Sequence, residues 1–267
     1  MKKSIKIAVS AGIVSALALM AGSASAADKT FGLIVNNMAF PYNVVLADGF
    51  TKGAAAKGAK VLILDSKMSM ETQANQVDDL LAQKVDGIAF MPNDSVAVQS
   101  LVDKVEAAGV PVVAAAVPVG DPLKNAVDYA YPKLTALVST NDVIAGHVAG
   151  VYAASTLAKD KEIQIAVVEG APGFAGVQQR QQGFEAALNE AGIKFKIVSS
   201  QPSNWTPESG ETICQNAITA NPDVDVIYSH ADDMALGCAK AIKAAGSKAR
   251  LIATGGGSKL GAEAIKK

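Results

Sequence analysis

The segment Tyr228–Cys238, YSHADDMALGC, places His230, Asp232 and Asp233 within four positions, directly after an apolar run. Imidazole and carboxylate side chains serve as general acids, general bases and metal ligands, so a reactive site is the first interpretation to weigh. The spacing opposes it, because neighbouring side chains at a helix start point apart. Ser229 beside His230 also lacks the arrangement of a nucleophile triad. We therefore expect neither a catalytic nor a metal-binding residue here.

The two aspartates have a simpler interpretation at the start of a helix. A carboxylate at this position accepts backbone N–H groups and is favoured by the helix dipole. Helix starts that follow strands also border the ligand crevice of open α/β sheets. We expect Asp232 to contact a ligand, and Asp233 to cap the helix or to face solvent.

Aromatic and amide side chains gather in two other segments that follow apolar runs. NNMAFPYN, residues 36–43, contains Phe40 and Tyr42, and QPSNWTPESG contains Trp205, the single tryptophan of the chain. Only 5% of the residues are aromatic, so such a cluster is a better ligand-stacking candidate than loop packing alone. Aromatic faces and amides suit a neutral polyhydroxyl ligand, because the faces pack on C–H surfaces while the amides bond to hydroxyls.

The glycine-rich segment TGGGSKLG, residues 254–261, resembles a phosphate-binding loop only in composition. It lacks the G-x-x-x-x-G-K-[ST] order, and turn glycines explain it better. We expect no cofactor.

The N-terminal segment, residues 1–26, has three lysines, then an apolar run, then small residues before Ala27. This order is typical of a secretory signal peptide. Because no cysteine follows the apolar run, we expect a periplasmic protein without a lipid anchor. The formal net charge of −1 and the lack of a long block of like charge argue against a nucleic-acid partner.

Cys214 and Cys238 are the only cysteines of the chain. They fall on predicted helices either side of the strand 225–229, and right-handed crossovers in one direction place both helices on the same face of the sheet. A disulfide and a pair of buried free thiols both fit this placement.

Apolar runs alternate with helical patterns along the chain, which predicts α/β folding. The runs are apolar throughout rather than alternating, as in parallel sheets that are covered on both faces. We predict strands at 30–35, 60–65, 86–91, 110–116, 163–169, 194–200, 225–229 and 250–254. This alternation stops between residues 117 and 139, where three prolines rule out a continuous helix. We therefore predict two doubly wound parallel-sheet lobes joined by a hinge, covering residues 27–135 and 136–267.

Several of these segments together resemble the ribose/galactose-type periplasmic sugar-binding proteins of ABC transporters. The resemblance covers nearly all of the chain after residue 26. It rests on NNMAFPYNVVLADGF, STNDVIAGHVAG, QQRQQGFEAAL, SSQPSNWTPESG and DVIYSHADDMALGCAKAI, and most specifically on DDMALG and the R-x-x-GF turn of Arg180–Phe184. It implies two lobes that close on a monosaccharide and deliver it to a membrane permease. It also implies a third hinge crossing beyond residue 267, so we expect the chain to be a C-terminal truncation.

Several family ligand positions are altered here. Ala116 and Val117 stand where the family has an Asp-Arg pair, Ala231 replaces an asparagine, and Gly256 replaces an acid. Gln178 stands in place of a ligand arginine, and Asn43 in place of a second aromatic. Each lost charged hydrogen bond weakens sugar recognition, so we expect a neutral and smaller or acyclic polyol. The expected ligand residues are Phe40, Tyr42, Asn43, Asn93, Asn141, Gln178, Trp205 and Asp232.

The leading hypothesis is a monomeric periplasmic solute-binding protein that delivers a small neutral sugar or polyol to an ABC transporter permease. One alternative is the sensor lobe of a sugar-responsive regulator, although the chain has a signal peptide and no basic helix-turn-helix segment. A role as a chemoreceptor partner is compatible with the leading hypothesis. An enzyme that uses Asp232 or Asp233 as a base is the remaining alternative.

Overall fold

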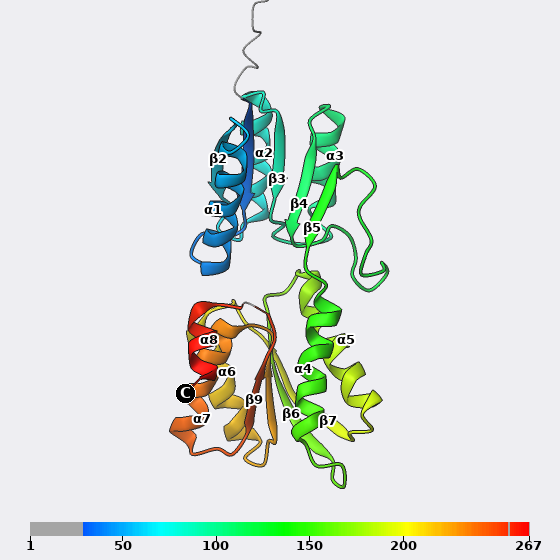
Figure 1. Ribbon diagram of the computed structural model, residues 1–267, viewed down its shortest axis with the longest axis vertical. Helices are drawn as coiled ribbons and strands as arrows, with labels where there is room; N and C mark the ends of the chain where they lie inside the picture. Colours follow the sequence, from blue (N-terminus) through cyan, green and yellow to red (C-terminus); the bar gives the residue numbers. More distant parts are fainter. Residues whose placement is uncertain (1–28, 256, 267) are drawn as a thin grey trace, which may run out of the picture.

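The computed structural model describes residues 29–255 and 257–266, which form two α/β lobes stacked along the long axis of the molecule (Figure 1). The expected signal peptide, residues 1–26, lies outside the described residues, as does Gly256. The two-lobe α/β architecture predicted from the alternating pattern is confirmed.

The first lobe is built on a five-stranded parallel sheet with the order β2-β1-β3-β4-β5. Its elements are β1 (Thr30–Val35), α1 (Pro41–Ala55), β2 (Lys60–Asp65), α2 (Met70–Ala82), β3 (Gly87–Phe90), α3 (Gln99–Ala107), β4 (Val112–Ala116) and β5 (Ala136–Ser139). Side chains of α2 and α3 pack with Ile34, Ile88 and Phe90 on one face. Ala47 of α1 packs with Leu33 on the other face.

The boundary predicted between residues 135 and 136 is wrong. Residues 136–139 form β5, which pairs with β4 from Val113↔Ala136 to Ala116↔Ser139 and so belongs to the first lobe. The sequence hides this strand because it is short and lies at the sheet edge, where Val138 is 65% exposed. The chain passes between the lobes immediately after Ser139, where β5 leads into α4 (Figure 1).

The second lobe is built on a four-stranded parallel sheet with the order β7-β6-β8-β9. Its elements are α4 (Asp142–Thr156), β6 (Ile163–Glu169), α5 (Ala175–Glu190), β7 (Phe195–Pro202), α6 (Pro207–Ala220), β8 (Val226–Ser229), α7 (Asp232–Ala245), β9 (Arg250–Ala253) and α8 (Lys259–Ile265). Two apolar clusters fill its faces, one containing α4 and α5 side chains and the other containing α6 and α7 side chains.

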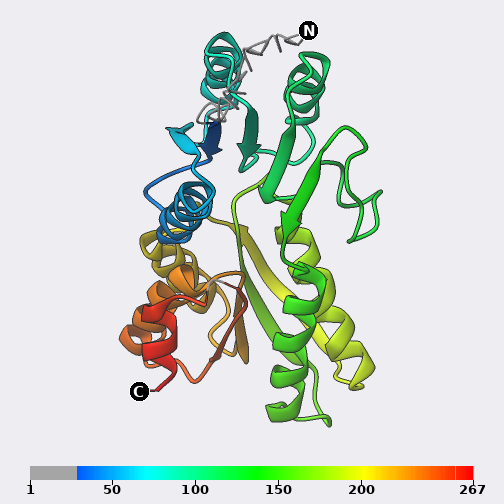
Figure 2. The ribbon, with the colours of Figure 1, turned by 45° about the horizontal axis from the view of Figure 1, so that its top comes forward.

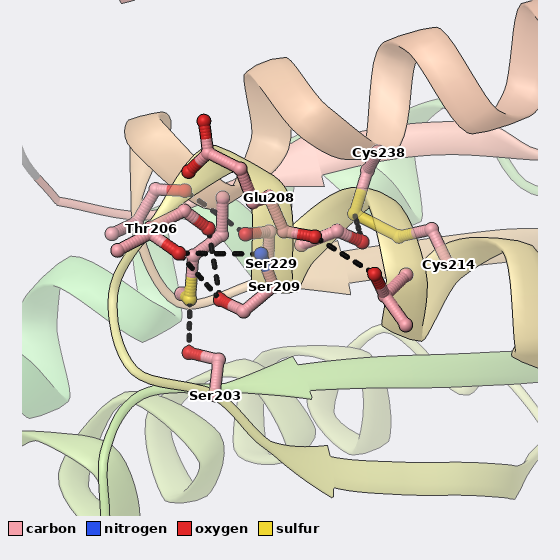
Figure 3. Close-up of a disulfide and its surroundings, with 11 residues drawn as sticks. Ser203, Thr206, Glu208, Ser209, Cys214, Ser229 and Cys238 are labelled. Carbon is pink, nitrogen blue, oxygen red and sulfur yellow. Dashed lines mark hydrogen bonds between the residues drawn. A yellow bond between two sulfur atoms is a disulfide. The ribbon is translucent and has the colours of Figure 1, made fainter.

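The helices of the second lobe pack in pairs at very short range. A Cβ atom at Gly183 of α5 would lie 2.0 Å from the carbonyl oxygen of Val143 in α4, and one at Gly237 of α7 would lie 1.9 Å from that of Pro207 in α6. Cys214 and Cys238 join α6 to α7 through a disulfide, with their Cα atoms 5.2 Å apart (Figure 3). Each helix pair is thus held as a unit.

Candidate functional site

The two sheets share one topology, and it decides where a ligand can bind. In each lobe the first strand lies between the second and the third, so β1/β3 and β6/β8 are the points where the winding direction reverses. Ligands of open α/β sheets bind outside the carboxyl ends of the strands at such points. The loops that follow these strands in both lobes line one cavity between the lobes.

This interlobe cavity has a volume of about 370 Å³, within the range typical of small-molecule sites. It is lined mainly by small and apolar residues: Phe40, Met91, Ala116, Val117, Ala145, Phe174, Gly176, Trp205, Ala231, Gly255 and Gly257. Its polar lining consists of Asn36, Tyr42, Asn43, Thr140, Asp142, Arg180 and Asp233. Four of the eight expected ligand residues are therefore in the lining, namely Phe40, Tyr42, Asn43 and Trp205.

The aromatic residues of the cavity are positioned by the ends of strands and helices. Phe40 is the N-cap residue of α1, Pro41 begins the helix, and Tyr42 follows in the first turn with 46% of its surface exposed. Trp205 follows β7 with φ 65°, a conformation that non-glycine residues rarely adopt. A Cβ atom at Gly170 would lie 1.8 Å from the Trp205 ring, so glycine at 170 makes room for the indole.

An ion pair on α4 and α5 supplies two of the three charged side chains in the cavity lining, and the sequence-based list of ligand residues missed it. Arg180 Nε donates to Asp142 Oδ1 at 2.8 Å, with side-chain exposures of 16% and 5%. Arg180 Nη1 also donates to the backbone oxygen of His230 at 2.5 Å. Burial and the Asp142 charge raise the pKa of Tyr42, and Arg180 partly offsets this. The charges of the second-lobe ion pair therefore act on the pKa of the first-lobe Tyr42 across the cavity.

The positions of the adjacent aspartates differ from the expectation. Asp233 lines the cavity, and burial, followed by the Asp232 charge, raises its pKa. Asp232 does not line the cavity, and its Oδ2 accepts the backbone N–H of Ser258 at 2.8 Å. The helix N-cap residue is Ala231, which makes no side-chain cap bond. Asp232 thus fixes the loop before α8, and Asp233 is the carboxylate available to a ligand.

Three expected amide ligands also lie outside the cavity lining. Asn93 is buried and accepts the Ser66 hydroxyl at 3.1 Å. Asn141 is the N-cap of α4, where its Oδ1 accepts the Ile144 N–H at 3.0 Å, and Gln178 is exposed on α5. Asn141 therefore acts on the site indirectly, because it caps the helix whose first residue is Asp142.

Asn43 lines the cavity, but its donors are already used. Its Nδ2 donates to Asn36 Oδ1 at 2.5 Å and to the backbone oxygen of Asn37 at 2.6 Å. An amide nitrogen carries two donors. The amide thus holds the loop between β1 and α1 and has no further hydrogen to give.

The lobes also touch directly beside the cavity. Ser95, in the loop before α3, donates its backbone N–H to the Gly173 oxygen at 2.9 Å, and its Oγ accepts the Ala175 N–H at 3.1 Å. Val117 packs with Phe174 and Val177 of the second lobe. These contacts connect the first lobe to the start of α5 on one side of the cavity.

Within the described ranges, no group of three or more His, Cys, Asp or Glu side chains is placed to hold a metal ion. His230, which raised that interpretation, is buried, and burial together with Arg180 lowers its pKa from 6.5 to about 3. It therefore stays neutral in the folded protein near neutral pH. None of the helices in the described part of the chain has the length and apolar character needed to span a bilayer.

Comparison with known proteins gives consistent matches. The profile of a family described as "Periplasmic binding protein domain" matches residues 31–267. The ribose import binding protein RbsB of Bacillus subtilis is 31% identical over 223 residues, which cover 84% of this chain and 68% of that protein. The D-allose-binding periplasmic protein of Escherichia coli is 26% identical over 240 residues, which cover 89% of this chain and 75% of the relative.

Solved structures agree with the fold. An ABC transporter periplasmic solute-binding protein of Actinobacillus succinogenes with bound D-allose superposes with a TM-score of 0.75 at 27% identity, covering 90% of this chain and 82% of that one. A Caulobacter myo-inositol binding protein bound to myo-inositol gives a TM-score of 0.73 at 25% identity, covering 83% and 72%.

Proposed function

The chain belongs to the periplasmic binding protein family, and from that premise we propose that its lobes close on a small neutral sugar or polyol. Like its relatives, it is a binding protein and not an enzyme. The hypothesis of a catalytic Asp232 or Asp233 is therefore dropped. The observation that carries the proposal is the cavity of about 370 Å³ between the lobes, to which both sheets contribute through the carboxyl ends of their strands.

The lining supports a neutral polyhydroxyl ligand. Tyr42 and Trp205 offer aromatic faces to C–H surfaces, while Arg180 and Asp233 offer a donor and an acceptor for hydroxyl groups. A ligand that touches residues of both lobes stabilises the closed arrangement, because only that arrangement makes all of its contacts.

The cellular role follows from the same premise. We propose that residues 1–26 export the chain to the periplasm and that the protein, as a monomer, delivers its ligand to an ABC permease in the inner membrane. The supporting observations are the signal-like order of those residues and the roles of relatives in periplasmic binding and ABC transport.

A thermal-shift screen of the purified protein against neutral sugars and polyols tests the proposal. We expect at least one compound to raise the melting temperature in a saturable manner, since a ligand bound only to the folded state stabilises it. Sugar acids of matched size serve as the comparison. No stabilisation by any neutral sugar or polyol would overturn the proposed ligand class.

A further inference from the structure

Resting on the proposed function, we propose that the ligand is a deoxy sugar or a deoxy polyol. One edge of it carries hydroxyl groups that meet Arg180, Asp142 and Asp233. Its other end lacks a hydroxyl group and lies against Val117 and Phe174.

The apolar end of the cavity is formed by a continuous cluster from both lobes. Val117, 8% exposed, packs with Ala171, Phe174 and Val177, and the partly buried Trp205 adjoins them. Val117 and Phe174 both line the cavity, so the cluster presents an apolar surface to the ligand.

The backbone at this end is also engaged. Ala116 has φ +64°, and this tight turn lets the Val117 N–H donate to the Ala115 oxygen at 2.7 Å. The Ala116 oxygen accepts the Ser139 hydroxyl at 3.1 Å. A ligand hydroxyl placed against Val117 therefore meets backbone groups that already have partners.

The first lobe adds few donors elsewhere in the cavity. The two Nδ2 hydrogens of Asn43 are committed to Asn36 and Asn37. The Asn36 amide nitrogen in turn donates to the Pro92 oxygen. Apart from the hydroxyls of Tyr42 and Thr140, which also line the cavity, the groups that can recognise ligand hydroxyls therefore come from the second lobe.

The polar groups of the cavity also lie close to Trp205. The Trp205 ring centroid is 5.8 Å from that of Phe174 and 5.9 Å from Arg180 Cζ. Arg180 carries five N–H donors, of which Asp142 and the His230 oxygen engage those on Nε and Nη1. A Cβ atom at Gly176 would lie 2.7 Å from Asp142 Oδ2, so glycine at 176 leaves this oxygen accessible. The cavity thus combines the hydroxyl-binding groups of Arg180 and Asp142 with the apolar surface of Val117 and Phe174, and the indole lies close to both sets.

The preference for a deoxy ligand follows from the cost of burying an unpaired hydroxyl. A hydroxyl that leaves water without gaining a partner weakens binding by about tenfold or more. Isothermal titration calorimetry with the full chain measures this with pairs that differ by one hydroxyl. Suitable pairs are D-galactose with D-fucose, D-ribose with 5-deoxy-D-ribose, and erythritol with butane-1,2,3-triol.

We expect the deoxy member of at least one pair to bind about tenfold tighter than its partner. Val117→Thr adds a hydroxyl at nearly constant shape, and we expect it to reduce or reverse that ratio. Val177→Thr is the matched control, since Val177 belongs to the same apolar cluster but not to the cavity lining. It should leave the ratio unchanged.

Either of two calorimetric results would overturn the inference alone. One is equal or tighter binding of the fully hydroxylated member in every pair that binds, and the other is an unchanged ratio in Val117→Thr. If neither member of any pair binds and the broader thermal-shift screen also finds no ligand, the inference falls together with the proposed function. If that screen finds a fully hydroxylated ligand while the deoxy compounds fail, only the inference falls.

Discussion

The helices of the two lobes are held in different ways. In the second lobe α4 packs on α5, and α6 on α7, through glycine contacts too short for any side chain, and a disulfide joins the second pair. In the first lobe, α1 carries Gly49 and Gly53, and an added Cβ at either would meet no atom within 4 Å. Both views of the ribbon show α4 and α5 lying side by side (Figure 2). Close helix packing through glycine is thus seen in the second lobe and not on α1.

This contrast assigns different tasks to the two halves of the site. Asp142 and Arg180 lie on α4 and α5 at their glycine contact, where a Cβ atom at Gly146 would lie 2.0 Å from the Arg180 oxygen. The close approach of the helices therefore sets the geometry of the ion pair. The first lobe supplies aromatic residues from the start of α1. We infer that the second lobe supplies the pre-organised charged groups of the site, whereas the first lobe covers it with Phe40 and Tyr42.

Removing the buried ion pair of the second lobe should give the largest loss of stability among these substitutions. Arg180→Met leaves Asp142 buried without its partner, and we expect a loss of about 3–5 kcal/mol in the free energy of unfolding. The first-lobe control is Lys104→Met, because the Lys104–Asp78 pair is about half exposed, where such pairs contribute at most about 1 kcal/mol. Urea unfolding followed by circular dichroism measures both. Equal costs in the two lobes would contradict the contrast.

Replacing a helix glycine by alanine should change the stability of the protein in opposite directions in the two lobes. Gly183→Ala forces a methyl group toward the Val143 oxygen, and we expect it to destabilise the protein by about 1–3 kcal/mol. Gly49→Ala meets no neighbour and should stabilise α1 by about 0.5–1 kcal/mol. Melting temperatures of the two variants provide the comparison. A change of the melting temperature in the same direction for both variants would contradict the contrast between the lobes.

His230 should make the stability of the second lobe depend on pH. Its pKa falls from 6.5 to about 3 in the folded state because of burial and then Arg180, so below pH 6.5 only the unfolded chain takes up the proton. Stability should therefore fall as the pH is lowered from 6.5 toward 3, by up to about 1.4 kcal/mol per pH unit. His230→Phe removes this contribution, whereas His147→Gln alters a partly exposed histidine that contacts Glu190. Identical pH profiles for wild type and His230→Phe would contradict the assignment.

Elements with buried apolar residues were predictable from the sequence. The bounds of β1, β2 and β6 agree with the predicted ones. The strand β5 was not predictable, since three of its four residues are exposed and it follows a long irregular segment. The spacing of apolar residues reflects which positions are buried, so an exposed edge strand cannot be recognised from it.

The charged part of the site was harder to predict. Asp142 and Arg180 are 38 residues apart and meet only because α4 and α5 approach closely. The choice between Asp232 and Asp233 depended on which side of the first turn of α7 faces the cavity. Successive residues on a helix point about 100° apart, so a start at Asp232, with Ala231 as N-cap, turns Asp233 toward the cavity. The aromatic residues were easier, because a rare residue type in a strand-end loop is visible without the fold.

The central claim is that a neutral polyol binds between the lobes against Trp205. Because Trp205 is the only tryptophan, its fluorescence reports on this cavity alone. Titration of the purified protein with a compound that raises its melting temperature should change the emission in a saturable manner, with the dissociation constant found by calorimetry. Calorimetric binding of that compound with no change in Trp205 emission would place the ligand elsewhere and contradict the account.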